Sequence, residues 1–365
     1  MKPVLFVTNY VPPARVGAFA ALAELMPVRF ALFGGRARHG GLGRDPGDLP
    51  FPVRHVTQRQ AGALAASGEY RAVVAGTVGR TALPAAYLGA RRARVPFVLW
   101  ATLWAQPGGP AGLAGYPLVR WIYSHADAVA TYGPHVSDYV RARGARRVHE
   151  APQAVDATFW GAPVDAATAQ AHRRAPWQAL FVGRLEREKG VDTLLDAWQM
   201  AGFPASDAAL VLAGGGPVRP RSTVPGTWFE GDRDAAEVRN FYAASHVVVV
   251  PSLPTRTFRE PWGMVVNEAM HQGLPVIATD AVGAAAGGLV RDGRNGLVVA
   301  AGDPGALAGA LRRLHDDPAT RERMGAAART DVAAYTHEAW ADGMARALED
   351  AGAGSARSGS RAQAG

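Results

Sequence analysis

The chain has 365 residues, of which 48% are hydrophobic, with 39 basic residues against 31 acidic ones and no cysteine. This length and apolar content suffice for two buried cores, and they exclude a chain that is disordered along most of its length. The absence of cysteine excludes a disulfide framework, a thiolate nucleophile and thiolate metal ligands.

Apolar runs along the chain are short. No stretch contains eighteen consecutive apolar residues, and the run at residues 4–7 is too short for the core of a signal peptide. We therefore expect no membrane-spanning segment and a cytoplasmic location.

Charge is unevenly distributed along the chain. Residues 1–155 hold 18 Lys and Arg against 7 Asp and Glu, whereas residues 156–365 hold 21 against 24. A basic first half favours an anionic partner, either a phosphorylated acceptor or the inner face of a membrane in peripheral contact. A GC-rich genome that inflates arginine is the alternative explanation. Nucleic acid is not an expected partner, because no basic run is interleaved with aromatic residues.

Short apolar runs, often β-branched, alternate with longer helical patterns through the first half of the chain. The predicted strands are 4–8, 28–33, 72–75, 97–100 and 128–132. This alternation predicts a parallel sheet flanked by helices. Because these strands are apolar almost throughout, we expect burial on both faces of the sheet.

A second set of strands follows a connecting stretch with little strand pattern, residues 152–176. Its members are 179–182, 209–212, 247–250 and 276–279. We expect the boundary near 155–161, with a first domain at 1–157 and a second at 158–337. Ligands of open α/β sheets bind at the carboxyl ends of the strands, so the cleft between two such domains is the expected site.

The C-terminal part of the chain is predicted to be helical. A helix at 338–350 is a candidate for packing back on the first domain. Residues 351–365 are nearly all Ala, Gly, Ser, Arg and Gln, a composition typical of a disordered tail.

Two glutamates, Glu260 and Glu268, are separated by seven residues. Pro261 and Gly263 interrupt whatever precedes them, and no further breaker occurs until Gly273, so a short helix beginning near Gly263 is predicted. Glu260 then lies before this helix and Glu268 within it.

The start of this helix is a candidate anion site. The first N–H groups of a helix have no internal partner and carry the positive end of its dipole, which favours a diphosphate. Gly263, Met264 and Val265 are therefore donor-binding candidates.

The strand at 179–182 runs into a loop that carries Arg184 and Lys189, and a helical pattern follows at 191–200. The chain contains only two lysines, Lys2 and Lys189. A lysine in the loop at the carboxyl end of a strand is a weak signal by itself, and it gains meaning only together with the glutamate pair.

Together these segments resemble the family 4 retaining glycosyltransferases of the GT-B fold. The motifs occur in the family's order over roughly residues 178–299: Gly-Arg-Leu and Lys-Gly at 183–190, Ala-Gly-Gly-Gly-Pro at 213–217, Phe-Glu-Gly at 229–231, Pro-Ser at 251–252, then the glutamate pair. The resemblance implies an α/β fold with two Rossmann-like, doubly wound domains facing across a cleft. The first would hold the acceptor and the second the nucleotide sugar.

The resemblance also implies a reaction. A hexosyl group would pass from a nucleoside-diphosphate sugar to a hydroxyl of a saccharide, glycolipid or small-molecule acceptor, with retention of configuration. Arg184 and Lys189 would bind the diphosphate and Glu260 the transferred sugar, which makes these three the catalytic candidates. Glu268 would hold the ribose hydroxyls. Cations beside the bridging oxygen stabilise the charge that grows on the leaving group.

Further donor-binding candidates come from the same motifs and from the first domain. They are Ser252, Gly215, Glu230 and Gly17. Many relatives carry a Gly-Gly pair after the first strand, whereas this chain has Gly17 alone. Relatives also place a histidine after the strand at 97–100, and this chain has none there. Trp100 and Trp104 are acceptor candidates that would stack on a sugar, with packing in the core as the alternative.

Asp232-Arg233-Asp234 has the D-x-D form that binds a divalent cation in a different glycosyltransferase fold. Here a turn that caps the following helix is the favoured interpretation. No histidine pair has ligand spacing, and Arg184 and Lys189 supply positive charge. We expect no metal and no cofactor besides the donor substrate.

Residues 116–123 are compatible with an interfacial helix, although a core helix is favoured. Two alternatives to a glycosyltransferase stay open: a nucleotide-sugar epimerase or hydrolase of the same fold, and a non-catalytic protein that binds sugar nucleotides.

Overall fold

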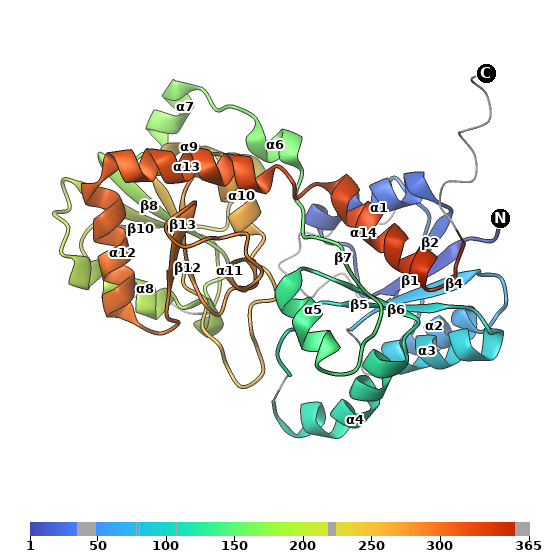
Figure 1. The fold of residues 1–365 in the computed structure, drawn as a ribbon. Helices are drawn as coiled ribbons and strands as arrows, with labels where there is room; N and C mark the ends of the chain where they lie inside the picture. Colours follow the sequence, from blue (N-terminus) through green and yellow to red (C-terminus); the bar gives the residue numbers. More distant parts are fainter. Residues whose placement is uncertain (35–48, 78, 80, 107, 218–223, 355–365) are drawn as a thin grey trace, which may run out of the picture. The chain divides into compact units, whose positions relative to one another are not determined.

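The computed structural model describes residues 1–34, 49–77, 79, 81–106, 108–217 and 224–354. It divides into two compact units, of which unit 1 comprises Met1–Val155 and the chain from Tyr335, and unit 2 comprises Asp156–Ala334. Each unit is built on one parallel sheet (Figure 1). Most of the tail expected at 351–365 lies outside the described residues.

The sheet of unit 1 has the strand order β3-β2-β1-β4-β5-β6-β7, and every pairing is parallel. Its strands are β1 (Val4–Thr8), β2 (Val28–Leu32), β3 (Val53–His55), β4 (Ala72–Gly76), β5 (Phe97–Ala101), β6 (Ala128–Thr131) and β7 (Val148–Glu150). The order reverses between β1 and β4, as in a doubly wound nucleotide-binding sheet.

Helices cover both faces of this sheet (Figure 1). They are α1 (Pro13–Leu25), α2 (Gln58–Ala65), α3 (Ala82–Ala93), α4 (Pro110–His125), α5 (Pro134–Arg141) and α14 (His337–Asp350). Helix α14 packs against α1 and β7, while α2 packs against α3. The C-terminal helix therefore completes the layer that α1 begins.

Aromatic side chains fill the space under α1 and α14. The rings of Phe19 and Phe30 stack with centroids 4.7 Å apart, and Trp340 of α14, which is fully buried, lies 5.4 Å from Phe19. Trp100 contributes its ring to the same cluster. This burial explains why the last helix is part of unit 1.

The sheet of unit 2 has the order β10-β9-β8-β11-β12-β13, again parallel throughout. Its strands are β8 (Trp177–Val182), β9 (Ala208–Ala213), β10 (Thr227–Gly231), β11 (Val247–Val250), β12 (Val276–Thr279) and β13 (Gly296–Val299). The order reverses between β8 and β11, so the predicted doubly wound architecture is confirmed in both units.

Unit 2 buries its main core on the face covered by α8 and α12, which pack against each other. Its helical elements are α6 (Ala157–Gly161), α7 (Ala166–Ala171), the 3₁₀ turn η2 (Arg187–Lys189), α8 (Val191–Ala201), α9 (Ala235–Ala244), α10 (Val265–His271), α11 (Gly283–Ala286), α12 (Pro304–Asp316) and α13 (Pro318–Val332). Helices α9 and α10 contact β8 and β11. The short helix predicted to begin near Gly263 and to contain Glu268 is confirmed as α10.

Helix α4, which contains residues 116–123, has both buried and exposed apolar side chains. Ile122 and Tyr123 are buried, whereas Leu118 and Trp121 keep 47% and 43% of their surface exposed. Within the described part of the chain, no helix has the length and apolar character needed to cross a membrane.

Candidate functional site in unit 2

The candidate site lies at the carboxyl ends of β8 and β11, the two neighbouring strands at which the order of the sheet reverses. Loops diverge from a parallel sheet at such a point, which leaves room for a ligand. The loop after β8 carries Arg184 and Lys189, and the segment after β11 carries Ser252 and Glu260. Four residues predicted from separate motifs are thus brought to one edge of one sheet.

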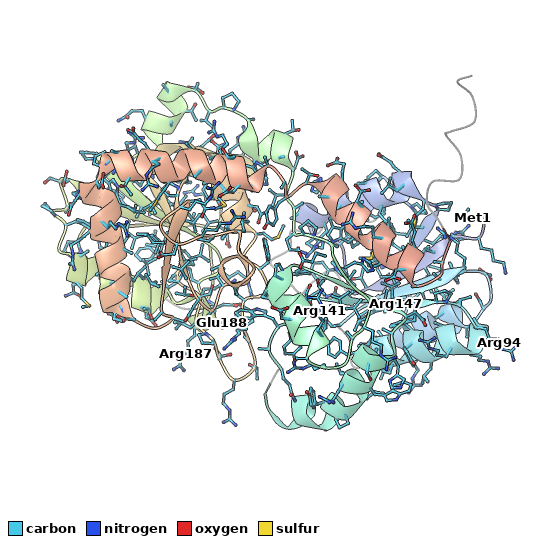
Figure 2. The ribbon with its side chains drawn as sticks, viewed as in Figure 1. Met1, Arg94, Arg141, Arg147, Arg187 and Glu188 are labelled. Carbon is cyan, nitrogen blue, oxygen red and sulfur yellow. The ribbon has the colours of Figure 1, made fainter. Side chains whose placement is uncertain are left out.

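Backbone contacts join the loop after β8 to the segment after β11. The amide of Leu253 donates to the carbonyl of Glu188 at 2.8 Å. Gly190 has φ +71°, and a Cβ at this position would lie 1.9 Å from the carbonyl oxygen of Pro251. Only glycine permits both this backbone conformation and this approach, so Gly190 sets the position of the preceding Lys189. Figure 2 labels Arg187 and Glu188 on the same loop.

Lys189, Ser252 and Glu260 form the centre of the site. The Nζ of Lys189 donates a hydrogen bond to Oε2 of Glu260, and the hydroxyl of Ser252 donates to the same oxygen at 3.1 Å. The side chains of Lys189 and Glu260 are only 19% and 10% exposed. Lys189 also lies over the ring of Phe258, with Nζ 5.6 Å from its centroid. Charge-assisted hydrogen bonds are strong, and this pair is largely shielded from water. The side chains of Lys189 and Glu260 therefore hold a defined orientation relative to each other.

The backbone around Glu260 is held independently of its side chain. Glu260 forms an isolated parallel bridge with Val282, and its carbonyl accepts from the amide of Gly283 at 3.1 Å. A Cβ on Gly283 would lie 2.0 Å from the carbonyl oxygen of Pro261. The segment before α10 is therefore packed directly on the start of α11, which positions Glu260 without a ligand.

Helix α10 presents unpaired amides where an anion site was predicted. Met264 is its N-terminal cap and makes no side-chain capping bond. Among the described residues, the amides of Gly263, Met264 and Val265 donate to no acceptor. Gly263 has φ +91°, a conformation that favours glycine.

Glu268 lies within α10, on the side that faces α9. It accepts a hydrogen bond from the hydroxyl of Tyr242 at 2.8 Å. Burial raises the pKa of Glu268 to about 7, against a smaller lowering by the Tyr242 hydrogen bond. Burial also raises the pKa of Tyr242, and the charge of Glu268 adds to this effect. Glu268 therefore titrates near neutral pH, and Tyr242 stays a hydrogen-bond donor.

Arg184 is more exposed than Lys189. Its Nη1 pairs with the carboxylate of Glu186, and 47% of its side chain is in contact with solvent. Burial and a hydrogen bond with the neighbouring Glu188 raise the pKa of Glu186. Arg184 thus lies at the edge of the site, half exposed and paired with Glu186.

Gly215 and Glu230 lie on the neighbouring loops. The carbonyl of Gly215 accepts from the amide of Leu185 at 2.8 Å, which ties the glycine-rich loop after β9 to the loop after β8. Glu230 is held by two arginines, Arg174 at 2.7 Å and Arg233 at 3.1 Å. Its carboxylate is thereby already engaged on both oxygens.

The three candidates from the first domain, Gly17, Trp100 and Trp104, lie in unit 1. Gly17 lies inside α1, and a Cβ there would meet the ring of His337 at 2.1 Å. Trp100 is 5% exposed and belongs to the aromatic core of unit 1, which leaves no open ring face for a sugar. Trp104 lies beyond the end of β5, with its ring 5.3 Å from that of His135.

Asp234 caps α9 by accepting from the amide of Glu237 at 2.9 Å, as predicted for the D-x-D segment. The described residues contain no cluster of histidine and acidic side chains that would hold a metal ion. Tyr242 was not predicted as a site residue, because a tyrosine on an amphipathic helix gives no signal in the sequence.

Residues 177–317, which contain this whole constellation, match the family described as "Glycosyl transferases group 1". Most of unit 2 is thus similar to this family. This match supports a family 4 type of glycosyltransferase, as the motifs predicted.

Curated proteins are similar to parts of this chain. Alpha-D-kanosaminyltransferase of Streptomyces kanamyceticus is 30% identical over 255 residues, which cover 65% of this chain and 64% of that protein. D-inositol 3-phosphate glycosyltransferase of Corynebacterium diphtheriae is 34% identical over 47% of this chain and 42% of its own length. The chain thus spans about half to two thirds of these relatives.

Solved structures share the fold along nearly the whole chain. HepE of Anabaena in complex with UDP has a TM-score of 0.76 and 18% identity, covering 95% of this chain and 99% of its own. Sucrose-phosphate synthase of Thermosynechococcus elongatus has a TM-score of 0.70 and 22% identity, covering 94% and 97%. These neighbours confirm the prediction of two Rossmann-like units of the GT-B type.

Proposed function

We propose that the protein is a retaining glycosyltransferase that moves a hexosyl group from a nucleoside-diphosphate sugar to an acceptor hydroxyl. The observation that carries the proposal is the contact of Lys189 with Glu260 at the strand-order reversal of unit 2. A cation that meets phosphate and a carboxylate that meets sugar hydroxyls must be adjacent in such an enzyme, because the bond that breaks joins the sugar to the diphosphate.

Each side chain has a role that fits its surroundings. Lys189 and Arg184 would bind the diphosphate, and the free amides at the start of α10 would add neutral donors to it. Glu260 would accept from hydroxyls of the transferred sugar. Glu268, further along α10, would accept from the ribose hydroxyls, with Tyr242 fixing its carboxylate.

The cations also support the chemical step. As the bond between the sugar and the diphosphate breaks, negative charge grows on the nucleoside diphosphate. Lys189 and Arg184 would therefore stabilise the transition state more than they stabilise the ground state. We propose that no metal ion is needed, because these two side chains supply the positive charge. We further propose attack from the face of the departing phosphate, which takes the acceptor's proton and thereby retains the anomeric configuration.

Similar proteins support a nucleotide-sugar donor. Three structures of HepE are complexes with UDP, with UDP and glucose, and with UDP-glucose. We therefore place UDP-sugars first among the candidate donors. The named relatives act on chemically different molecules, and the acceptor is proposed only as a saccharide, glycolipid or small hydroxylated molecule.

The test is a screen of nucleoside-diphosphate sugars against an acceptor panel, read as release of nucleoside diphosphate. We expect transfer by the wild type, loss of turnover in Glu260→Gln, and a product whose anomeric proton shows the donor's configuration by NMR. Wild-type turnover retained in Glu260→Gln would refute the role of this carboxylate.

Two other functions are separated by the same screen. Product formed from donor alone would identify an epimerase or a hydrolase. Nucleotide binding by calorimetry without turnover on any acceptor would identify a non-catalytic sugar-nucleotide-binding protein.

We also propose peripheral contact with an anionic membrane surface through unit 1. Leu118 and Trp121 are exposed on α4, and basic side chains such as Arg94, Arg141 and Arg147 (Figure 2) lie at the surface of the same unit. Anionic lipid attracts basic residues, while exposed apolar side chains enter the interface. Sedimentation with phosphatidylglycerol vesicles, compared with phosphatidylcholine vesicles, tests this; equal sedimentation with both would refute it.

A further inference from the structure

Arg15 lies in the first turn of α1, directly after β1, at the carboxyl edge of the unit 1 sheet. Its guanidinium carbon lies 4.9 Å from the ring centroid of Trp100 and 4.9 Å from that of Tyr132. Its Nη2 donates a 2.6 Å hydrogen bond to the hydroxyl of Tyr132. Residues from β5 and from the end of β6 therefore hold this cation in one orientation.

The surroundings of Arg15 are rich in donors and poor in acceptors. Within the described residues no carboxylate pairs with Arg15, although its side chain is partly buried. The hydroxyl of Tyr132 accepts from Arg15, and the indole nitrogen of Trp100 is buried without a hydrogen-bond partner. A guanidinium has five N–H donors, and most of those on Arg15 have no acceptor in this part of the chain.

Two other arginines of unit 1, which also lie over tyrosine rings, have a carboxylate or a carbonyl as acceptor. Arg91 pairs with Asp127 at 3.0 Å. Arg143 stacks on Tyr139 at 3.4 Å and also donates to the carbonyl of that residue at 2.9 Å. Arg15 resembles Arg143 in its aromatic support and in having a neutral acceptor, and unlike Arg91 it has no carboxylate partner among the described residues. A bound oxyanion would supply that charged acceptor.

Arg15 lies at the edge of the sheet where ligands bind in doubly wound folds. The strand order of unit 1 reverses between β1 and β4, and Arg15 follows β1. The hydroxyls of Thr77 and Thr102, which follow β4 and β5, pair at 3.0 Å on the same edge of the sheet. In doubly wound sheets this edge, at the reversal, is where ligands bind.

We propose that Arg15 binds an oxyanion carried by the acceptor, so that the acceptor is a phosphorylated or carboxylated hydroxy compound. The proposal rests on the proposed glycosyltransferase function and names its substrate class. The donor diphosphate is the other source of an oxyanion, but unit 2 already offers Lys189 and Arg184 for it. The excess of basic residues in 1–155 favours an anionic ligand of unit 1.

The experiment measures binding rather than turnover. The nucleoside diphosphate that binds most tightly among UDP, GDP, ADP and dTDP is first identified by calorimetry and then kept saturating. Inorganic phosphate, glucose 6-phosphate and glucuronate are next titrated against glucose as the neutral reference. If no nucleotide binds, the proposed function fails by that result alone, and the same titrations without nucleotide still test Arg15.

The wild type is compared with Arg15→Gln, Arg15→Lys and Tyr132→Phe. Arg92→Gln, at an exposed position of α3, is the control that removes one positive charge from the same unit. We expect at least one anionic probe to bind about tenfold more tightly than glucose, a preference lost in Arg15→Gln and partly kept in Arg15→Lys. Tyr132→Phe should weaken it less than Arg15→Gln, and Arg92→Gln should not change it.

Three results would overturn the proposal. One is a wild type that prefers none of the anionic probes to glucose, and another is an Arg15→Gln variant that binds them like the wild type. The third is a loss of nucleoside-diphosphate affinity in Arg15→Gln with the probes unaffected, which would assign Arg15 to the donor. Arg15→Lys, which keeps the charge, guards against a folding defect in Arg15→Gln, and near-UV circular dichroism of each variant checks the aromatic cluster.

Discussion

Lys189 donates its hydrogen bond to the same oxygen of Glu260 that the hydroxyl of Ser252 contacts. Both partners of this pair are mostly buried, so the ligand-free site keeps a cation and an anion in mutual contact. In the proposed complex with a nucleotide sugar, Lys189 would contact the phosphate and Glu260 would contact the sugar hydroxyls. The pair thus holds both groups in position before the donor arrives.

Replacing Lys189 by Gln should reduce kcat strongly while the protein stays folded. Removing one preorganised donor from a developing anion costs about 10²–10³ in kcat, and we expect an effect of this size. Lys2→Gln is the matched control, because Lys2 is the only other lysine and bonds an exposed backbone carbonyl. The measurement is initial-rate release of nucleoside diphosphate. A kcat for Lys189→Gln within a few-fold of the wild type would refute the assignment.

Nucleoside-diphosphate affinity should rise with pH through the pKa of Glu268, about 7. Below this pKa the carboxyl is protonated and has less acceptor capacity, and above it the carboxylate would accept fully from the ribose hydroxyls of the proposed donor. Calorimetric titration between pH 6 and 8 on wild type and Glu268→Gln tests this, because the variant should lose the pH dependence. A wild-type affinity that stays constant over this range would contradict the prediction.

Glu268 should also make folding stability depend on pH. Its pKa is raised in the folded state from 4.5 to about 7, so between these values the folded protein binds more protons than the unfolded chain. Stability contributed by this group is therefore present below the unfolded pKa and is lost as pH rises toward 7. The slope is at most about 1.4 kcal/mol per pH unit. The free energy of unfolding of the wild type minus that of Glu268→Gln, measured in denaturant, should shrink or change sign as pH rises from 4.5 to about 7.

Tyr242→Phe should raise the pKa of Glu268 further, because the Tyr242 hydrogen bond lowers it. The variant should therefore bind nucleoside diphosphate less tightly near pH 7, with the deficit smaller at pH 9, where Glu268 is ionised in both proteins. Loss of the hydrogen bond itself should cost about 1 kcal/mol of stability. An affinity deficit that is the same at both pH values would show that the tyrosine acts by another route.

Gly190→Ala should damage the site more than its backbone conformation alone predicts. The added Cβ would meet the carbonyl oxygen of Pro251 at 1.9 Å, which forces the Lys189 loop away from the segment that carries Glu260. Gly202→Ala is the control, since Gly202 has nearly the same φ, +70°, and nothing within 4 Å of the added Cβ. The control should lose roughly 1 kcal/mol of stability, and Gly190→Ala clearly more. Equal losses for both variants would contradict a role for the close approach.

The strands that the sequence predicted are the central ones of each sheet. Five of them lie in unit 1 and four in unit 2, and the sheet edges β3, β7, β10 and β13 were not predicted. Central strands are buried on both faces and read as unbroken apolar runs. An edge strand such as Thr227–Gly231 is largely exposed, with Trp228 and Phe229 in contact with solvent, and its pairing depends on a neighbour that no local pattern reveals.

The sequence by itself indicated which chemical groups the candidate site contains. The helix that begins near Gly263 was predicted because glycine, proline and apolar periodicity act locally and leave a readable pattern, whereas Arg184, Lys189 and Glu260 were named from motifs that resemble those of a known family. What those groups contact was decided by tertiary structure. Residues 71 positions apart, such as Lys189 and Glu260, meet only because β8 and β11 are neighbours in the sheet.

In unit 1, too, the structure differs from the prediction because residues far apart in the sequence come into contact. Trp100 was a candidate for sugar stacking, but α14, more than two hundred residues further along the chain, buries its ring in the core. Arg15 belonged to no motif, and its orientation is set by Trp100 on β5 and by Tyr132 directly after β6. Local propensity therefore determined the elements and the residue types. The order in which strands pair, which depends on burial summed over the whole unit, decided which side chains form a site.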